Sequence, residues 1–439
     1  MKKYLYIILL ILPLIGFGQG WETNFGGEGN DEGFSVQQTT DGGYIIGGCT
    51  SSYGNGSYDV YLLKTDGSGN EQWSQTFGGI EDDRGWSIQQ TTDGGYIITG
   101  VTNFWGANGS SDVYLIKTDD NGNEQWSQTF GGTNSDAGNS VQQTIDGGYI
   151  ISGRTRSYVN GSNADVDVYL IKTDGNGNEL WSQTYGGTEG DYGASVQQTS
   201  DEGYIITGYT RSYGNGNGYD VYLIKTDGGG NEQWSQTFGG IEHDLGLSVQ
   251  QTTDGGYIIT GYTRSYGNGY DDVYLIKTDS YGNQQWSQTY GGVDNERGES
   301  VQQTTDGGYI ITGYTESYVN GSDDQRDVYL IKTDSSGNEQ WSQTYGGVYW
   351  DSGYSVQQTT DGGFIITGET VSPGTTNLYL IKTNEWGNIT STIELPNPQS
   401  KRELIKTTNI LGQENITIKN QPLIEIYDDG SVEKKYIIE

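Results

Sequence analysis

The sequence predicts an all-β protein: a seven-bladed β-propeller of four-stranded antiparallel blades, closed by its N-terminal strand and followed by a small C-terminal β appendage. Two observations lead to this prediction. One unit recurs seven times at spacings of 52 to 55 residues. Each copy holds four short segments rich in Val, Ile, Tyr, Thr and Trp, which is strand chemistry. The copies are headed by Trp21, Trp73, Trp126, Trp181, Trp234, Trp286 and Trp341.

The first 18 residues do not belong to the predicted fold. Two lysines precede an apolar run that ends at Phe17, and Gly16 and Gly18 are small residues ahead of a cleavage point near Gln19. This pattern is typical of a secretory signal peptide over residues 1–18. The run is too short for a lasting membrane span, so we expect a protein that is secreted or held at the outer cell surface.

Each copy predicts four strands in the order SVQQT, YIITG, DVYLIKT and NEQWSQT, which we name strands a to d. Strand c is apolar on both faces, with Val60 and Leu62 on one side and Tyr61 and Leu63 on the other. A sheet of this kind must lie between two others. Radial stacking of blades meets that need, with the repeated Trp filling the space between blades. A parallel β-solenoid is the competing architecture, but its coils are shorter than these units and lack the tight hairpins.

The turns inside each copy are rich in Gly. The sequence Thr-Asp-Gly-Gly joins strands a and b, and the fourth copy has Glu202 in place of the first Gly. Only the second position, such as Gly203, is Gly in all seven copies. We therefore expect a type I turn whose left-handed residue is the second Gly, and the same backbone need at Gly69 in the c–d turn.

Ring closure follows from the order of strands at the two ends. The predicted mature chain begins with a d strand, Trp21 to Phe25, and the last copy ends with a c strand, Leu378 to Thr383. We expect Trp21 to Phe25 to complete the final blade, so that no sheet edge stays open. The rival for that place is the segment 388–393. The predicted propeller spans residues 19–385.

The C-terminal segment, residues 386–439, has almost no Gly and abandons the repeat. Pro396 and Pro398 mark the boundary. Short strands are predicted at Arg402 to Thr407, Pro422 to Tyr427 and Val432 to Ile438.

The repeated pattern SVQQTxDGGYIITG, followed by DVYLIKTDxxGNEQWSQTYGG, resembles the SBBP-type β-propeller repeat and, more distantly, NHL-type blades. This resemblance covers Trp21 to about Thr383 and implies an extracellular or envelope protein with a binding or structural role. It offers no catalytic residues to carry over. The tail, with ILGQ and then PLIEIYDDGSVEKKYIIE, resembles sorting domains of the type IX secretion system, which implies the type IX export machinery as a partner. The alternative is a small β appendage that packs on the propeller.

Composition restricts the chemistry. The formal net charge of -35 disfavours nucleic acid and anionic membrane surfaces. The single cysteine, Cys49, excludes an internal disulfide. The single histidine, His243, stands in a loop that varies between copies, and we interpret it as loop variation. The sequence has no catalytic triad, zinc ligand set or phosphate loop, so we expect no catalytic residues, no metal site and no cofactor.

The predicted hairpins place the a–b and c–d turns on one face of the disc, the turn face, and the d–a and b–c loops on the other, the loop face. The loop face varies between copies and is the natural recognition surface. Each d–a loop carries one carboxylate two residues before a Gly. These carboxylates have two interpretations. They could form a ring that attracts cations, or each could cap its own turn by accepting backbone N–H bonds. They are Asp31, Asp83, Asp136, Asp191, Asp244, Glu296 and Asp351.

The b–c loops carry an aromatic residue at a fixed offset, except in the seventh copy, which has Pro373. Exposed aromatics beside Arg suit stacking on sugars or contact with a protein partner, but each could equally pack over its own blade. The candidate ligand-binding residues are Tyr53, Trp105, Tyr158, Tyr213, Tyr266 and Tyr318, with Arg156, Arg211 and Arg264.

These observations favour a secreted or cell-surface monomer that acts as a non-enzymatic binding or structural module for a glycan or a surface protein. The alternative is an extracellular polysaccharide hydrolase. The repeat TDGSGNEQW is superficially similar to the Asp-box turns of sialidase-like propellers but is longer than that motif. A glycosidase needs two carboxylates in different environments, and the repeated acids single out no such pair.

Overall fold

The structure is a computed structural model that describes residues 20–102, 110–159, 165–216, 218–319 and 325–389, together with three strands between residues 404 and 436. The chain divides into two compact units, Met1–Thr390 and Ser391–Glu439. The predicted signal peptide and Trp105 lie outside the described residues. Every helix or strand element in the described part is a strand, which confirms the all-β prediction.

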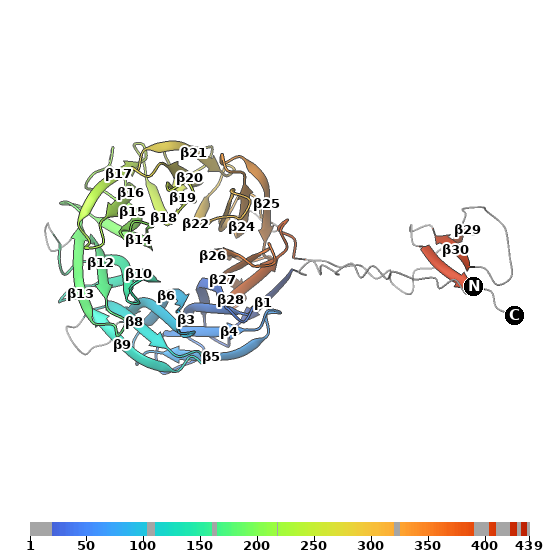
Figure 1. Cartoon of the computed structure of the whole chain (residues 1–439), viewed down its shortest axis with the longest axis horizontal. Helices are drawn as coiled ribbons and strands as arrows, with labels where there is room; N and C mark the ends of the chain where they lie inside the picture. Colours follow the sequence, from blue (N-terminus) through green and yellow to red (C-terminus); the bar gives the residue numbers. More distant parts are fainter. Residues whose placement is uncertain are drawn as a thin grey trace, which may run out of the picture. The chain divides into compact units, whose positions relative to one another are not determined.

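The first unit is a ring of seven four-stranded antiparallel sheets, as predicted (Figure 1). The innermost strands, of type a, are β2 (Asp31–Gln38), β6 (Asp83–Gln90), β10 (Asp136–Gln143), β14 (Asp191–Gln198), β18 (Asp244–Gln251), β22 (Glu296–Gln303) and β26 (Asp351–Gln358). The b strands are β3 (Tyr44–Thr50), β7 (Tyr96–Thr102), β11 (Tyr149–Thr155), β15 (Tyr204–Thr210), β19 (Tyr257–Thr263), β23 (Tyr309–Thr315) and β27 (Phe364–Ser372).

The c strands are β4 (Asp59–Thr65), β8 (Asp112–Thr118), β12 (Asp167–Thr173), β16 (Asp220–Thr226), β20 (Asp272–Thr278), β24 (Asp327–Thr333) and β28 (Thr375–Thr383). The outer d strands are β5 (Glu71–Phe77), β9 (Glu124–Phe130), β13 (Glu179–Tyr185), β17 (Glu232–Phe238), β21 (Gln284–Tyr290), β25 (Glu339–Tyr345) and, for the last blade, β1 (Trp21–Phe25). Blades 1 to 7 are numbered by their a strands in chain order.

The N-terminal strand closes the ring. β1 pairs antiparallel with β28, and the register runs from Trp21 opposite Lys382 to Phe25 opposite Leu378. The prediction for closure is therefore confirmed. The rival segment 388–393 does not take this place on β28, and its residues 390–393 lie outside the described part of the chain.

Seven hydrophobic cores hold the ring, and each core lies between two neighbouring blades. In blade 1, Val60 and Leu62 pack toward blade 2, while Tyr61 and Leu63 pack toward blade 7. Each of these four side chains is at most 3% exposed. The Trp repeated at the start of each copy is half-buried at the same junctions: the ring centre of Trp73, for example, lies 5.9 Å from that of Tyr96 in the next blade.

The inner edges of the a strands are satisfied by side chains of the preceding blade. In every blade the first Gln of SVQQ accepts a hydrogen bond at 2.6 Å from the backbone N–H of the second Gln in the next blade. The Ser of the same motif accepts from the next Val or Ile N–H at 3.2–3.4 Å. This relay passes through all seven blades and returns to the first. Each bond contributes about 1 kcal/mol, and each removes an unpaired edge donor.

The a–b turn differs from the sequence prediction. The left-handed residue is the first of the two glycines, such as Gly255 with φ 84°. In blade 4 Glu202 takes this conformation with φ 65° and is the one non-glycine residue with positive φ in the described chain. The second glycine is needed for a different reason. A Cβ at Gly203 would lie 2.1 Å from the Thr226 carbonyl oxygen and 2.5 Å from Lys225 Nζ.

That Lys225 ammonium belongs to an ion pair that is repeated at the turn face, and in this copy the lysine is buried and the aspartate is more than half exposed. Lys225 Nζ donates to Asp201 of the a–b turn at 2.9 Å and to the Thr226 carbonyl at 2.8 Å. The same pairing ties strand c to the a–b turn in all seven blades. All seven lysines of the propeller are therefore fixed by ion pairs at the turn face.

The second unit contains a three-stranded antiparallel sheet. Its strands are β29 (Leu404–Asn409), β30 (Pro422–Tyr427) and β31 (Val432–Tyr436). The three strands predicted for the C-terminal segment are present, with ends that differ by two residues.

Substitutions at two neighbouring residues of the blade 4 a–b turn should change the free energy of unfolding in opposite directions. Glu202→Gly should raise the free energy of unfolding by about 1 kcal/mol, because glycine adopts a left-handed conformation without steric cost. Gly203→Ala should lower it by at least about 2 kcal/mol, because its methyl group meets a backbone carbonyl. Urea unfolding followed by circular dichroism measures both.

Gly255→Ala is the matched control. It adds a methyl group at a left-handed position with no heavy atom within 4 Å, so its cost should be conformational and lie at about 1 kcal/mol. If Gly203→Ala proved as stable as the wild type, the close-contact explanation of the invariant glycine would be wrong.

Candidate ligand site at the loop face

The seven d–a carboxylates lie at the loop-face ends of the inner strands, where the sequence placed them. All are buried, with exposures of 0–2%. Asp31 shows the arrangement: Oδ2 accepts from the Gly27 N–H at 2.9 Å and from the Ser52 hydroxyl at 2.5 Å, and Oδ1 accepts from the Thr50 hydroxyl. Asp31 thus ties its d–a loop to its b–c loop, and the same double tie is made by Asp136, Asp191, Asp244 and Glu296. Asp83 and Asp351 accept from the N–H groups of Gly79 and Gly347 in their d–a loops. The cation-attracting ring stays a prediction.

A second carboxylate faces most of these groups from the preceding blade. The residue six places before the last Thr of strand c is Asp in blades 1 to 6 and Asn377 in blade 7. Asp112 Oδ1 and Asp136 Oδ2 both press against Gly131, at 2.1 and 2.6 Å from the place that a Cβ would occupy. Asp112 Oδ1 is buried and has no hydrogen-bond partner in the described structure. Burial, and then the charge of Asp136, raise the pKa of Asp112 to about 6.

The b–c loop tyrosines lie over their own blades. Their rings are 47–50% exposed. Each ring lies 5.6–5.9 Å from a strand-c tyrosine, and each hydroxyl donates to a glycine carbonyl at 2.7–3.1 Å. The five tyrosines are therefore fixed by packing while one side stays open to solvent. Their part in ligand binding stays a prediction.

The three predicted arginines have different surroundings. The Arg156 side chain is exposed. Arg211 lies 3.6 Å from Glu189 and 5.6 Å from the ring centre of Tyr219. Arg264 donates from Nε to the buried carboxylate of Asp271 at 2.5 Å.

Side chains that differ between blades occupy the loop-face ends of strands a and b, and some of them, such as Cys49 and Ser352, are fully buried. They come from three positions inside otherwise repeated strands: the residue after the d–a carboxylate, the residue two places later, and the residue before the last Thr of YIITGxT. We name this set the channel rim. Its members are Glu32, Arg84, Ala137, Tyr192, Leu245, Arg297 and Ser352; Phe34, Trp86, Asn139, Ala194, Leu247, Glu299 and Tyr354; and Cys49, Val101, Arg154, Tyr209, Tyr262, Tyr314 and Glu369.

An alternating row of rings and guanidinium groups follows the rim across blades 5 to 7. Arg297 lies 4.1 Å from the ring centre of Tyr262 and 5.9 Å from that of Tyr314. Arg326 lies 4.9 Å from Tyr314 and 5.2 Å from Trp350. Cation–π contacts of this kind hold long side chains in one geometry, so this part of the rim is preorganised.

Blade 4 and its neighbours carry the densest aromatic group of the rim. The rings of Tyr192 and Tyr209 stack at 4.7 Å, and Tyr219 stands edge-on to both, at 5.9 and 5.2 Å. His243 lies 5.5 Å from Tyr219, and its Nδ1 accepts the Tyr219 backbone N–H at 3.2 Å.

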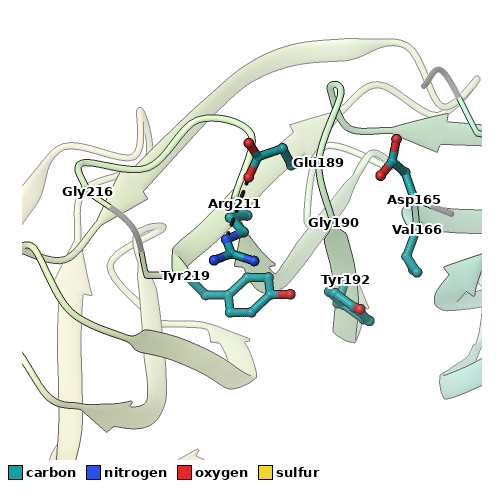
Figure 2. Close-up of a pocket in the computed structure, with 8 residues that line it drawn as sticks. All are labelled: Asp165, Val166, Glu189, Gly190, Tyr192, Arg211, Gly216 and Tyr219. Atoms are coloured by element: carbon teal, nitrogen blue, oxygen red, sulfur yellow. Dashed lines mark ion pairs between the residues drawn. The ribbon is translucent and has the colours of Figure 1, made fainter. Parts of the chain in front are cut away.

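Two cavities open beside this aromatic group. The first cavity, of about 580 Å³, lies between blades 3 and 4 (Figure 2) and is lined by Asp165, Val166, Glu189, Gly190, Tyr192, Arg211, Gly216 and Tyr219. The second cavity, of about 300 Å³, is lined by Tyr192, Tyr209, Tyr219, His243, Leu245, Tyr262 and Arg264. Figure 2 shows the Arg211 guanidinium above the Tyr219 ring, with Tyr192 on the neighbouring strand. Both sizes suit a small ligand or one segment of a polymer.

Arg211 and Arg264, which line these cavities, were predicted from the sequence as candidate site residues, whereas Tyr192, Tyr219 and His243 were not. The signal that was available is disagreement between copies: these residues occupy positions at which the seven repeats differ. His243 lines the second cavity, so the interpretation as loop variation was incomplete.

No protein-family model matches the chain. Among curated proteins, the regulatory protein FlaEY of Caulobacter vibrioides is 27% identical over 181 residues, which are 36% of this chain and 19% of FlaEY. The chain therefore spans about a fifth of that relative's length.

Solved structures with a similar fold include Sqt1 from Chaetomium thermophilum, with 11% identity, 93% of this chain and 97% of that chain covered, and a TM-score of 0.45. Another is the Neurospora crassa Pan2 WD40 domain, with 9% identity, 82% and 98% covered, and a TM-score of 0.49. At these values the likeness says nothing about what this chain binds. From its own architecture, the chain is a seven-bladed β-propeller repeat protein.

Within the described residues, no helix is long and apolar enough to span a membrane. In the same part of the chain, no three or more His, Cys, Asp or Glu side chains are grouped so that they could hold a metal ion.

The carboxylate pairs predict an unusual dependence of stability on pH. The pKa of folded Asp112, about 6, lies above the 3.8 of an unperturbed Asp. Between these values the folded state holds the extra proton, so stability should fall as pH rises from about 4 to 6. Asp112→Asn should therefore raise the free energy of unfolding at pH 7 by on the order of 1 kcal/mol and leave it unchanged at pH 4. Urea unfolding at the two pH values measures this.

Asn377→Asp is the reverse control, because it places a second carboxylate, from blade 7, beside Asp31 of blade 1. It should lower stability at pH 7 and have little effect at pH 4. Equal effects of Asp112→Asn at both pH values would contradict the account of the pair.

Proposed function

We propose that this chain is an exported binding module that holds a glycan or surface protein at the loop-face end of its channel. One observation carries the proposal. Seven blades with nearly identical strands differ in the side chains of the channel rim, and two cavities open there beside the densest group of unlike residues. Variation confined to one surface of a repeated scaffold is typical of recognition.

The site is built for contact rather than for covalent chemistry. Its aromatic rings are locked by stacking, and its guanidinium groups are held by carboxylates and rings. Rigid aromatics and arginines of this kind commonly supply most of the binding energy of an interface. The proposal therefore includes no catalytic step and no cofactor.

Export is the second part of the proposal. It is supported by the charged and apolar pattern of residues 1–18 and by the SBBP-like repeat. A folded three-stranded C-terminal sheet supports the resemblance of the tail to type IX sorting domains. We propose that the tail addresses the protein to the outer cell surface or medium. Intact mass of the protein from medium and from cells reports removal of both end segments.

The binding proposal predicts the effect of one substitution. Tyr219→Ala should weaken binding to a captured glycan or surface protein at least about tenfold, because Tyr219 borders both cavities. The melting temperature should change little. Binding to immobilised glycans and cell-surface proteins measures the first effect, and calorimetry the second.

Tyr281→Ala is the matched control, since Tyr281 is 71% exposed in a c–d turn at the turn face. It should leave binding unchanged. Equal loss in both variants, or release of new reducing ends from a polysaccharide by the wild-type protein, would contradict a loop-face module without catalysis.

A further inference from the structure

We propose that the two cavities are adjoining subsites for neighbouring sugars of an uncharged linear polysaccharide, with His243 as a hydrogen-bond donor to the second sugar. This inference rests on the proposed function and names its ligand class.

The cavities are contiguous. Tyr192 and Tyr219 line both of them. Tyr219 stands edge-on to the stacked pair of Tyr192 and Tyr209. The rings that separate the two cavities therefore cannot rotate freely. Groups bound on their two sides are then separated by little more than one aromatic ring. A ligand with a repeating unit suits this arrangement better than a single compact molecule.

The first cavity disfavours an anionic ligand. It presents the carboxylates of Asp165 and Glu189 against the single guanidinium of Arg211. The ion pair between Glu189 and Arg211 is 3.6 Å long, with side-chain exposures of 58% and 46%, so both groups remain open to further hydrogen bonds. Sugar hydroxyls can donate to carboxylates and accept from Arg211. The chain's net charge of -35 further opposes an acidic polymer.

The second cavity has the opposite imbalance, because two guanidinium groups share one carboxylate there, so the two cavities taken together are close to neutral. Arg264 is paired with Asp271 at 2.5 Å, and Asp271 also binds Arg297 at 2.7 Å. Leu245 and Tyr262, each 9% exposed, form an apolar wall. Such a surface suits the C–H face of a pyranose ring.

His243 supplies a further polar group to the second cavity. Its Nδ1 accepts the Tyr219 backbone N–H at 3.2 Å, which places the ring proton of neutral imidazole on Nε2. The free donor is therefore Nε2–H. The pair is confined to one junction, because no other copy combines a Tyr before strand c with a His in the following d–a loop.

The inference is tested by titrating the whole chain with purified oligosaccharides of one to four sugars. Neutral gluco-, manno- and xylo-oligosaccharides are compared with oligouronates of the same lengths and with a lysine-rich peptide. For one neutral series, affinity should rise at least tenfold from one sugar to two and change little beyond. Oligouronates and the peptide should bind at least tenfold more weakly.

Substitutions then assign the second subsite. His243→Leu should reduce affinity for the disaccharide to that for the monosaccharide, whereas His243→Gln, which keeps an N–H donor, should recover part of the loss. Tyr281→Ala again serves as the control, and the melting temperature of each variant reports on folding.

The outcomes separate this inference from the function on which it rests. Tight binding of an oligouronate or of the basic peptide that is lost in Tyr219→Ala would overturn the neutral-polysaccharide assignment and leave the loop-face binding module intact. Affinity independent of length, or unaffected by His243→Leu, would overturn the two-subsite arrangement. Glycan binding unaffected by Tyr219→Ala would overturn both.

Discussion

The structure depends on one constraint: every blade is apolar on both faces, so no blade can complete a hydrophobic core alone. Each core takes residues from two neighbouring sheets, and the last core joins blade 7 to blade 1. A linear stack would leave two apolar faces in water, at about 25 cal/mol for each Å² exposed. A closed ring leaves none. The return of β1 to β28 follows from this constraint, because it ties the last blade to the start of the first repeat.

Polar side chains stabilise the closed ring at two places, the inner edges of the a strands and the turn face. The Ser and Gln side chains of SVQQ satisfy the inner edges of the a strands, and the Lys–Asp pairs, each with a buried lysine, fix the turn face. Both devices repeat in every blade and use the positions that vary least. The loop-face end of the channel carries none of these bonds, so its side chains are free to differ between copies. The contacts that stabilise the ring and the side chains that differ between copies therefore lie in different parts of the same strands.

Much of the fold could be predicted because it is local or periodic. Repeat length, alternation and Gly-rich turns specify the hairpins, and the apolar pattern of Val60 to Leu63 requires stacked blades. The role of Gly203 could not be predicted in the same way. Its invariance arises from contact with Thr226 and Lys225 of strand c, which is a tertiary contact, and Glu202 shows that the left-handed position beside it tolerates a side chain.

The site was predicted only in part, for a related physical reason. A consensus of the repeats contains only what the copies share. The loop tyrosines that it selects, such as Tyr213, pack on their own blades. Tyr192, Tyr219 and His243 come from different strands and loops of two blades, and they meet only because adjacent copies are stacked. The available signal was the set of strand positions at which the repeats differ, because stacking of the blades brings those side chains together.

The shared cores make the closed ring, rather than the single blade, the unit of stability. Equilibrium unfolding of the propeller in urea, followed at once by tryptophan fluorescence and by far-ultraviolet circular dichroism, tests this most directly. If every core is shared and the ring is closed, the two signals should change in one coincident, cooperative transition. Separate transitions, in which blades are lost one after another from an end, would contradict it.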